Sequence, residues 1–186
     1  MRPRHLVSLL VLVNVACAPA ERAPEDITDT SCFGGRVLSF RDLVAEVVIP
    51  AGETCIGGSF QVVFTRGDDT LSTLTETRVG TVGFIGTADV DGDGHGEFFI
   101  STQSTDAEAR GALYAYTEGA NGIGRLMLAP LDSAQRTGYA GQDRFGFGGG
   151  DQLVRSFPRA EADTAWFGYA HGTKQWNAIK RPAWLR

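Results

Sequence analysis

The chain of 186 residues is long enough for one domain with a sizeable hydrophobic core. Its 42% hydrophobic and 21% charged residues are typical of a globular protein. The formal net charge of −5 argues against nucleic-acid binding, which needs a basic face. The 24 glycines and the scarcity of helical periodicity favour short strands joined by tight turns.

Residues 1–16 have the pattern of a signal peptide. A basic start precedes an apolar run at 6–13, which is too short to span a bilayer. Two processing sites follow. The sequence VAC at 15–17 resembles a lipobox, in which Cys17 is lipidated, although Asn14 departs from that pattern. The sequence APA at 18–20 instead fits signal peptidase cleavage and a secreted chain. Both alternatives predict a protein of the cell envelope (periplasm or outer membrane lipoprotein) or a secreted one.

Three cysteines are an odd number for an oxidising compartment. Either processing route leaves two free cysteines, because Cys17 is lipidated in one and removed with the signal peptide in the other. We therefore predict a disulfide between Cys32 and Cys55. In the chain-entropy model this bond stabilises the fold by about 3 kcal/mol.

Residues 17–31 are rich in Pro, Ala and acidic side chains, so we predict a disordered tether. It would lead into a β domain at 32–186, made of a core at 32–131 and a C-terminal β extension at 132–186. Apolar and β-branched segments bounded by turn residues predict its strands. The predicted strands are residues 43–49, 59–65, 78–85, 97–102, 112–117, 125–131, 152–157, 165–169 and 175–179.

A short helix is expected only at residues 132–136. The predicted fold class is therefore all-β, a twisted β-sandwich or two-sheet domain of short antiparallel strands. The simplest interpretation of the C-terminal extension is a hairpin that protects an edge strand.

The sequence DVDGDGHGE at 89–97 is the most specific motif of the chain. It places carboxylates at Asp89, Asp91, Asp93 and Glu97, that is, at positions one, three, five and nine. Ca²⁺ takes six to eight oxygen ligands, and this spacing wraps oxygens around one centre. At position seven, His95 would offer its backbone carbonyl. The motif predicts a calcium site.

The flanks of this motif are strand-like, and position twelve is Ile100 where an EF-hand needs Glu. The motif therefore resembles the FG-GAP repeat, the calcium-binding unit of integrin-type propellers, also seen in VCBS-type repeats. The chain is too short for a full propeller, which needs at least four blades of four strands.

Residues 58–116 resemble, over about a third of the chain, the periplasmic inhibitors of i-type lysozyme. The blocks that carry the resemblance are GSFQV at 58–62, RVGTV at 78–82 and ADVDGDG at 88–94 with Glu97. The resemblance implies a non-enzymatic protein that binds a protein partner, a lysozyme.

One departure from that family falls in the loop after the calcium-like motif. The family has S-G-x-Y there, in a loop thought to enter the lysozyme cleft, and this chain has Ala-Glu-Ala-Arg at 107–110. We expect the loop to contact a partner through its polar and charged residues, namely Ser104, Asp106, Glu108 and Arg110.

Catalytic motifs are scarce. There is no G-x-S-x-G, H-E-x-x-H or phosphate loop, and His171 lies in a predicted turn. We therefore expect a binding protein, not an enzyme. Two alternatives stay open, a structural envelope lipoprotein and a glycan- or matrix-binding module. The second alternative predicts that Trp166, Trp176 or Trp184 lies exposed beside a groove.

Overall fold

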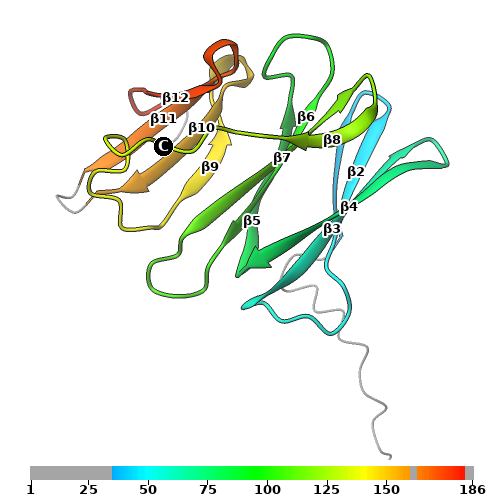
Figure 1. The fold of residues 1–186 in the computed structure, drawn as a ribbon, viewed down its shortest axis with the longest axis horizontal. Coiled ribbons are helices and arrows are strands. Elements are labelled where there is room, and N and C mark those ends of the chain that lie inside the picture. Colours follow the sequence, from blue (N-terminus) through cyan, green and yellow to red (C-terminus); the bar gives the residue numbers. More distant parts are fainter. Residues whose placement is uncertain (1–34, 160–162, 183–186) are drawn as a thin grey trace, which may run out of the picture.

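Three four-stranded antiparallel sheets make up the part of the chain that the computed structural model describes, residues 35–159 and 163–182 (Figure 1). The predicted all-β class is confirmed. The first sheet is β1 (Arg36–Phe40), β2 (Leu43–Val48), β3 (Gly57–Arg66) and β4 (Asp69–Val79). The middle sheet is β5 (Thr81–Ala88), β6 (Glu97–Gln103), β7 (Gly111–Gly119) and β8 (Gly122–Leu126). The third sheet is β12 (Gln175–Ala178), β11 (Thr164–Ala170), β10 (Leu153–Pro158) and β9 (Arg144–Phe147).

The middle sheet is covered on both faces. In β6, Phe98 and Ile100 pack into a core shared with the first sheet, and Phe99 packs into a second core shared with the third sheet. All three side chains are fully buried. Successive side chains of a strand point to opposite faces, so a continuous apolar run is what a central layer requires.

The C-terminal extension forms the third sheet. Its inner face contributes Leu153, Phe157, Phe167 and Tyr169 to the second core. It therefore covers a whole face of the middle sheet, and the interpretation as a hairpin at an edge is wrong. The first two sheets alone form the expected sandwich, and the third sheet adds a layer.

Gly80 divides the strand predicted at 78–85. Its φ is +77°, and a Cβ atom there would lie 1.8 Å from the carbonyl oxygen of Gln103. The chain therefore leaves the first sheet at Val79 and enters the middle sheet at Thr81, with glycine required at the crossing. The short helix predicted at 132–136 does not form, and residues 133–138 are turns instead. The side chains of Asp132 and Gln135 accept hydrogen bonds from each other's backbone N–H groups there, as in a capping box.

Arg78 is a buried cation that anchors the segment before β3. Its guanidinium donates hydrogen bonds to the carbonyl oxygens of Ser59, Thr54 and Gly80 at 2.9, 2.7 and 2.5 Å. It also lies 3.6 Å from the carboxylate of Glu53. Hydrogen bonds from Ser59, and then the charge of Arg78, lower the pKa of Glu53. A buried charge needs such partners.

Cys55 lies in this anchored segment and is disulfide-bonded. Its predicted partner Cys32 lies outside the described residues, so the pairing stays a prediction. Cys17, the predicted signal peptide at 1–16 and the predicted tether at 17–31 also lie outside them.

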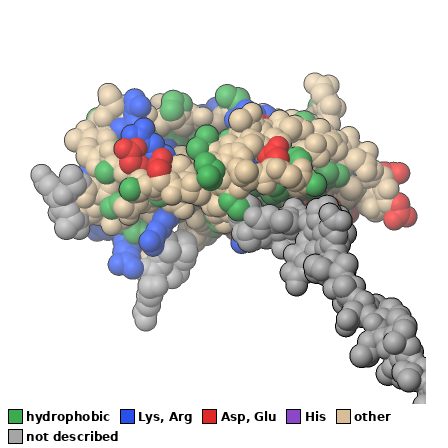
Figure 2. Space-filling model, turned by 90° about the horizontal axis from the view of Figure 1, so that it is seen from below, with side chains coloured by type: hydrophobic (Ala, Val, Ile, Leu, Met, Phe, Trp, Pro, Cys, Tyr) green, Lys and Arg blue, Asp and Glu red, His purple; other side chains and the backbone are tan. Residues whose placement is uncertain are grey.

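The surface carries both signs of charge. Figure 2 shows the molecule from below Figure 1, with Lys and Arg gathered toward the end that holds the third sheet. Hydrophobic side chains form small separate patches on this face. Within the described residues, no helix is long and apolar enough to cross a membrane.

Candidate functional site

The motif at 89–97 forms the loop between β5 and β6, so the predicted strand–loop–strand arrangement is confirmed. Its carboxylates accept hydrogen bonds from the loop's own backbone. Asp89 accepts from the N–H groups of Gly92 and Gly94 at 2.7 and 3.0 Å. Asp91 accepts from the N–H of Asp93 at 3.1 Å. These bonds fix the loop around its acidic side chains.

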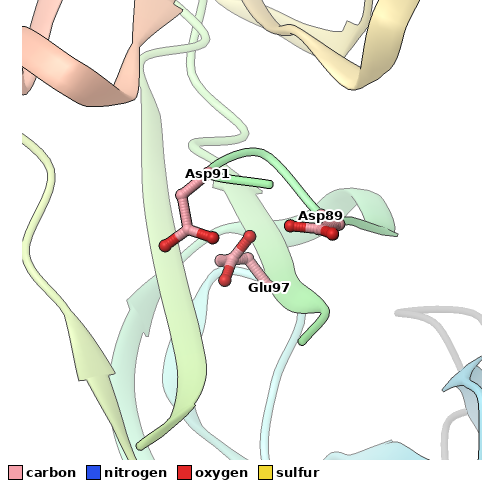
Figure 3. Close-up of side chains that lie close together, drawn as sticks. All are labelled: Asp89, Asp91 and Glu97. Carbon is pink, nitrogen blue, oxygen red and sulfur yellow. The ribbon is translucent and has the colours of Figure 1, made fainter. Parts of the chain in front are cut away.

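Three carboxylates converge in this loop. Oxygen atoms of Asp89, Asp91 and Glu97 all lie within 4.8 Å of one another, and Figure 3 shows the groups facing a common centre. Glu97 is 1% exposed and accepts hydrogen bonds from Val90 N–H (2.8 Å) and Thr117 Oγ1 (3.1 Å). Burial raises the pKa of Glu97, and the negative charge of Asp91 adds to this effect. A buried carboxylate beside two others favours a bound cation.

Two predicted ligands, Asp93 and His95, are not among these three carboxylates. The Oδ1 atom of Asp93 accepts a hydrogen bond from His95 N–H at 2.7 Å, and Asp93 is not among the three converging carboxylates. The imidazole Nδ1 of His95 points elsewhere, 3.7 Å from Glu118 Oε2. Participation of Asp93, and of His95 through its carbonyl, stays a prediction.

His171 also approaches the acidic loop. It lies in the 3₁₀ turn His171–Thr173 between β11 and β12, as the turn prediction implied. Its Nε2 is 3.5 Å from Asp91 Oδ2, which the sequence could not indicate, because the two residues meet only through the packing of the third sheet.

The loop at 104–110 joins β6 to β7, at the opposite end of β6 from the acidic loop (Figure 1). Two of its predicted contact residues also form hydrogen bonds that close the loop, and their contact with a partner stays a prediction. Ser104 Oγ donates to Asp106 Oδ1 at 2.8 Å and accepts from Arg110 N–H at 2.8 Å. The same Asp106 oxygen accepts from the N–H groups of Glu108 and Ala109. The hydrogen bond from Ser104 is the largest cause that lowers the pKa of Asp106.

Glu108 and Arg110 point outward. Their side chains are 56% and 65% exposed and form an ion pair at 2.5 Å. Such an exposed pair stabilises the fold little. Beside the loop lies a hollow of about 320 Å³, partly lined by Arg110, Tyr114 and Val79, and Val79 is 64% exposed.

Residues 141–143, just before β9, contact this loop from the third sheet. The N–H of Gln142 donates to the carbonyl of Glu108 at 2.7 Å. The buried carboxylate of Asp143 accepts from Gly111 N–H at 2.9 Å. The sequence does not indicate a role for these residues, since no local motif marks a contact between residues 32 positions apart.

The tryptophans differ in environment. Trp166 lines a hollow of about 680 Å³ on the third sheet, together with Phe147 and Arg144. Trp176 is 4% exposed, and its Nε1 donates to the carbonyl of Ala129 at 2.8 Å, so it is a core residue. Trp184 lies outside the described residues.

Fold and site together define an all-β protein of stacked sheets that presents two structured loops at the two ends of one buried strand. No family model and no curated protein matches the chain. A solved structure of PliI-Ah, the periplasmic lysozyme inhibitor of I-type lysozyme from Aeromonas hydrophila, is 20% identical to it. That match covers 53% of this chain and 93% of PliI-Ah, with a TM-score of 0.46. The same organism's PliI in complex with Meretrix lusoria lysozyme is 19% identical, covering 50% of this chain and 80% of that one, with a TM-score of 0.45.

Proposed function

We propose that this chain is an exported, non-enzymatic binding protein that contacts a protein partner through the loop at 104–110. The observation that carries the proposal is the construction of this loop. Ser104 and Asp106 close it from within, which leaves Glu108 and Arg110 exposed on a fixed backbone. A contact surface that is ordered before binding loses less conformational entropy when the partner docks.

An i-type lysozyme is the concrete partner that we propose. The sequence blocks at 58–62, 78–82 and 88–97 support it through their resemblance to inhibitors of that enzyme. Because Ala-Glu-Ala-Arg stands at 107–110 in place of S-G-x-Y, the contact would rely on charge. Glu108 and Arg110 would exchange their mutual ion pair for partners across the interface. The exposed Val79 and the adjoining hollow would supply apolar contact area.

We also propose that Ca²⁺ binds the acidic loop. Asp89, Asp91 and Glu97 supply hard oxygen donors at mutual distances that fit one ion. Glu97 is buried, so its charge is not solvated by water and would be stabilised by a cation. Among the described residues, no Lys or Arg forms an ion pair with Glu97. The ion would stabilise the β5–β6 turn, far from the partner loop.

The test measures the lytic activity of a panel of lysozymes, i-type included, with the purified protein added without its predicted signal peptide and with calcium present. The double variant Glu108→Ala/Arg110→Ala should weaken inhibition about tenfold or more, as loss of one good interface contact does. The matched control Glu46→Ala/Arg136→Ala removes the same charges from exposed positions outside the loop and should inhibit as the parent does. Absence of inhibition of every lysozyme at micromolar excess would exclude the lysozyme partner.

Trp166 favours a second candidate function, glycan binding. The indole lines the 680 Å³ hollow with Arg144 and aromatic side chains, a combination suited to stacking on a sugar ring that carries a carboxylate. Titration with uronic acid oligosaccharides should then change tryptophan fluorescence in the parent and not in Trp166→Phe. An unchanged signal in the parent would exclude this function.

We propose in addition that the chain is exported to the cell envelope. Cys17 then either carries the lipid anchor or is removed with the signal peptide. Mass spectrometry of the mature N-terminus distinguishes the two alternatives.

A further inference from the structure

The contacts of Asp143 give the third sheet a role beyond covering the middle sheet. We infer that Asp143 is a positioning residue, which fixes the conformation of the loop at 104–110. The inference deepens the proposed function and rests on it for its consequence in partner binding. The conformational part can be tested without any partner.

Asp143 is fully buried and uses both carboxylate oxygens. Its Oδ2 accepts hydrogen bonds from Gly111 N–H at 2.9 Å and from the hydroxyl of Tyr139. Its Oδ1 accepts from Arg155 Nε at 2.7 Å. Arg155 lies within 6 Å of the ring centres of Tyr139, Phe145 and Phe157, which keep it in place. The carboxylate is therefore held from the third sheet and directed at the first residue of β7, immediately after Arg110.

A second set of hydrogen bonds joins the loop at 104–110 to residues 142–143. The N–H of Gln142 donates to the carbonyls of Glu108 and Ala109 at 2.7 and 3.1 Å. The side chain of Gln103 donates to the carbonyls of Ala109 and Asp143, both at 3.2 Å. The carbonyls of the loop thus have donors outside the loop.

The loop needs this support because its backbone is strained. Ala109 has a φ of +44°, which costs a residue with a Cβ about 1–2 kcal/mol. Such strain persists only where the surroundings enforce it. Ala109 lies between Glu108 and Arg110, so relaxation at this residue would redirect both exposed side chains. A partner would then find the binding conformation in only a fraction of molecules.

The decisive measurement is amide hydrogen exchange of the full chain by NMR, comparing the parent with Asp143→Ala. Exchange at Gly111 should accelerate by about tenfold or more, because local opening no longer breaks the bond from its N–H to Asp143. Exchange at Ala109, whose N–H donates to Asp106, should accelerate with it because the loop is no longer held in place. Asp143→Asn retains one acceptor and should restore part of the protection. Unchanged exchange at both amides in Asp143→Ala would overturn the inference.

Tyr169→Leu is the matched control for a general loss of stability. Tyr169 is 5% exposed and packs against Trp176 in the third sheet, and it is not among the hydrogen-bond or ion-pair partners of Asp143. It should lower the free energy of unfolding without selectively accelerating exchange at 109–111. Equal acceleration in Tyr169→Leu and Asp143→Ala would mean that Asp143 acts only through the stability of the sheet, which also overturns the inference.

Lysozyme inhibition separates the inference from the proposed function. If the parent inhibits, Asp143→Ala should raise the inhibition constant about tenfold while Asp143→Asn raises it less. Faster exchange with an unchanged inhibition constant would overturn the role in binding. Faster exchange in a protein whose parent inhibits no lysozyme would support the positioning of the loop and reject the lysozyme partner.

Discussion

The loops at 89–96 and 104–110 adjoin opposite ends of the same strand, β6, and are stabilised in different ways. The acidic loop is organised by its own carboxylates, which accept hydrogen bonds from its own backbone. The loop at 104–110 is also closed from within, yet it depends in addition on donors and acceptors from the third sheet. The acidic loop is therefore specified largely by its local sequence, and the loop at 104–110 depends more on packing between segments that are far apart in the chain.

Two glycines give the sharpest test of this difference. Gly141 and Gly92 both have left-handed backbone conformations, with φ of +89° and +76°. A Cβ atom on Gly141 would lie 1.7 Å from the carbonyl oxygen of Glu108, whereas a Cβ atom on Gly92 would meet no other atom within 4 Å. Gly92→Ala should cost about 1 kcal/mol from backbone strain alone. Gly141→Ala should cost about 3 kcal/mol and release the loop at 104–110, since the clash adds to the strain.

Urea unfolding of the two variants gives both free energies. Similar costs for the two substitutions would show that the approach of the third sheet to the loop contributes nothing.

Calcium removal should act on the acidic loop alone. At a free Ca²⁺ concentration of about a hundred times its dissociation constant, binding to the folded state stabilises by about 2.7 kcal/mol. For a chain of this size that amounts to roughly 5–10 °C in Tm. Chelation should remove this shift and leave exchange at Ala109 and Gly111 unchanged.

The variant Glu97→Gln should lose the calcium-dependent shift in Tm, and Asp106→Asn should retain it. A parent Tm that is identical with excess calcium and with chelator would contradict the metal proposal.

The sequence predicted the acidic loop and its flanking strands because the signal is contained in nine consecutive residues. It predicted the positions of β2, β3, β6 and β7 from apolar periodicity. It missed β4, in which Thr and Ser alternate with few apolar residues, and it missed the division of a strand at Gly80. It did not indicate that Asp106 also bonds within its own loop, and the predicted contact of Asp106 with a partner stays a prediction.

The smallest expected effect is on the pH dependence of stability, where the two loops should differ in sign. With calcium chelated, Glu97 has a pKa raised above its ordinary 4.5. Its contribution is present below pH 4.5 and is lost as the pH rises through the raised folded pKa. Asp106 has a pKa lowered from 3.8, so its contribution is present above that value and is lost as the pH falls through the lowered folded pKa.

Free energies of unfolding in chelator, measured from pH 3 to 7, test this. Glu97→Gln should flatten the decline toward neutral pH, and Asp106→Asn should flatten the decline on the acid side. A Glu97→Gln profile parallel to that of the parent would contradict the assigned burial effect.

The position of β6 between two cores has a consequence for how the protein unfolds. Neither core can open without exposing Phe98 and Ile100 on one side or Phe99 on the other, and these side chains belong to adjacent positions of one backbone. We therefore expect the three layers to unfold as a single cooperative unit. The loops at both ends of the strand can open locally, but we expect global unfolding to disrupt all three sheets together.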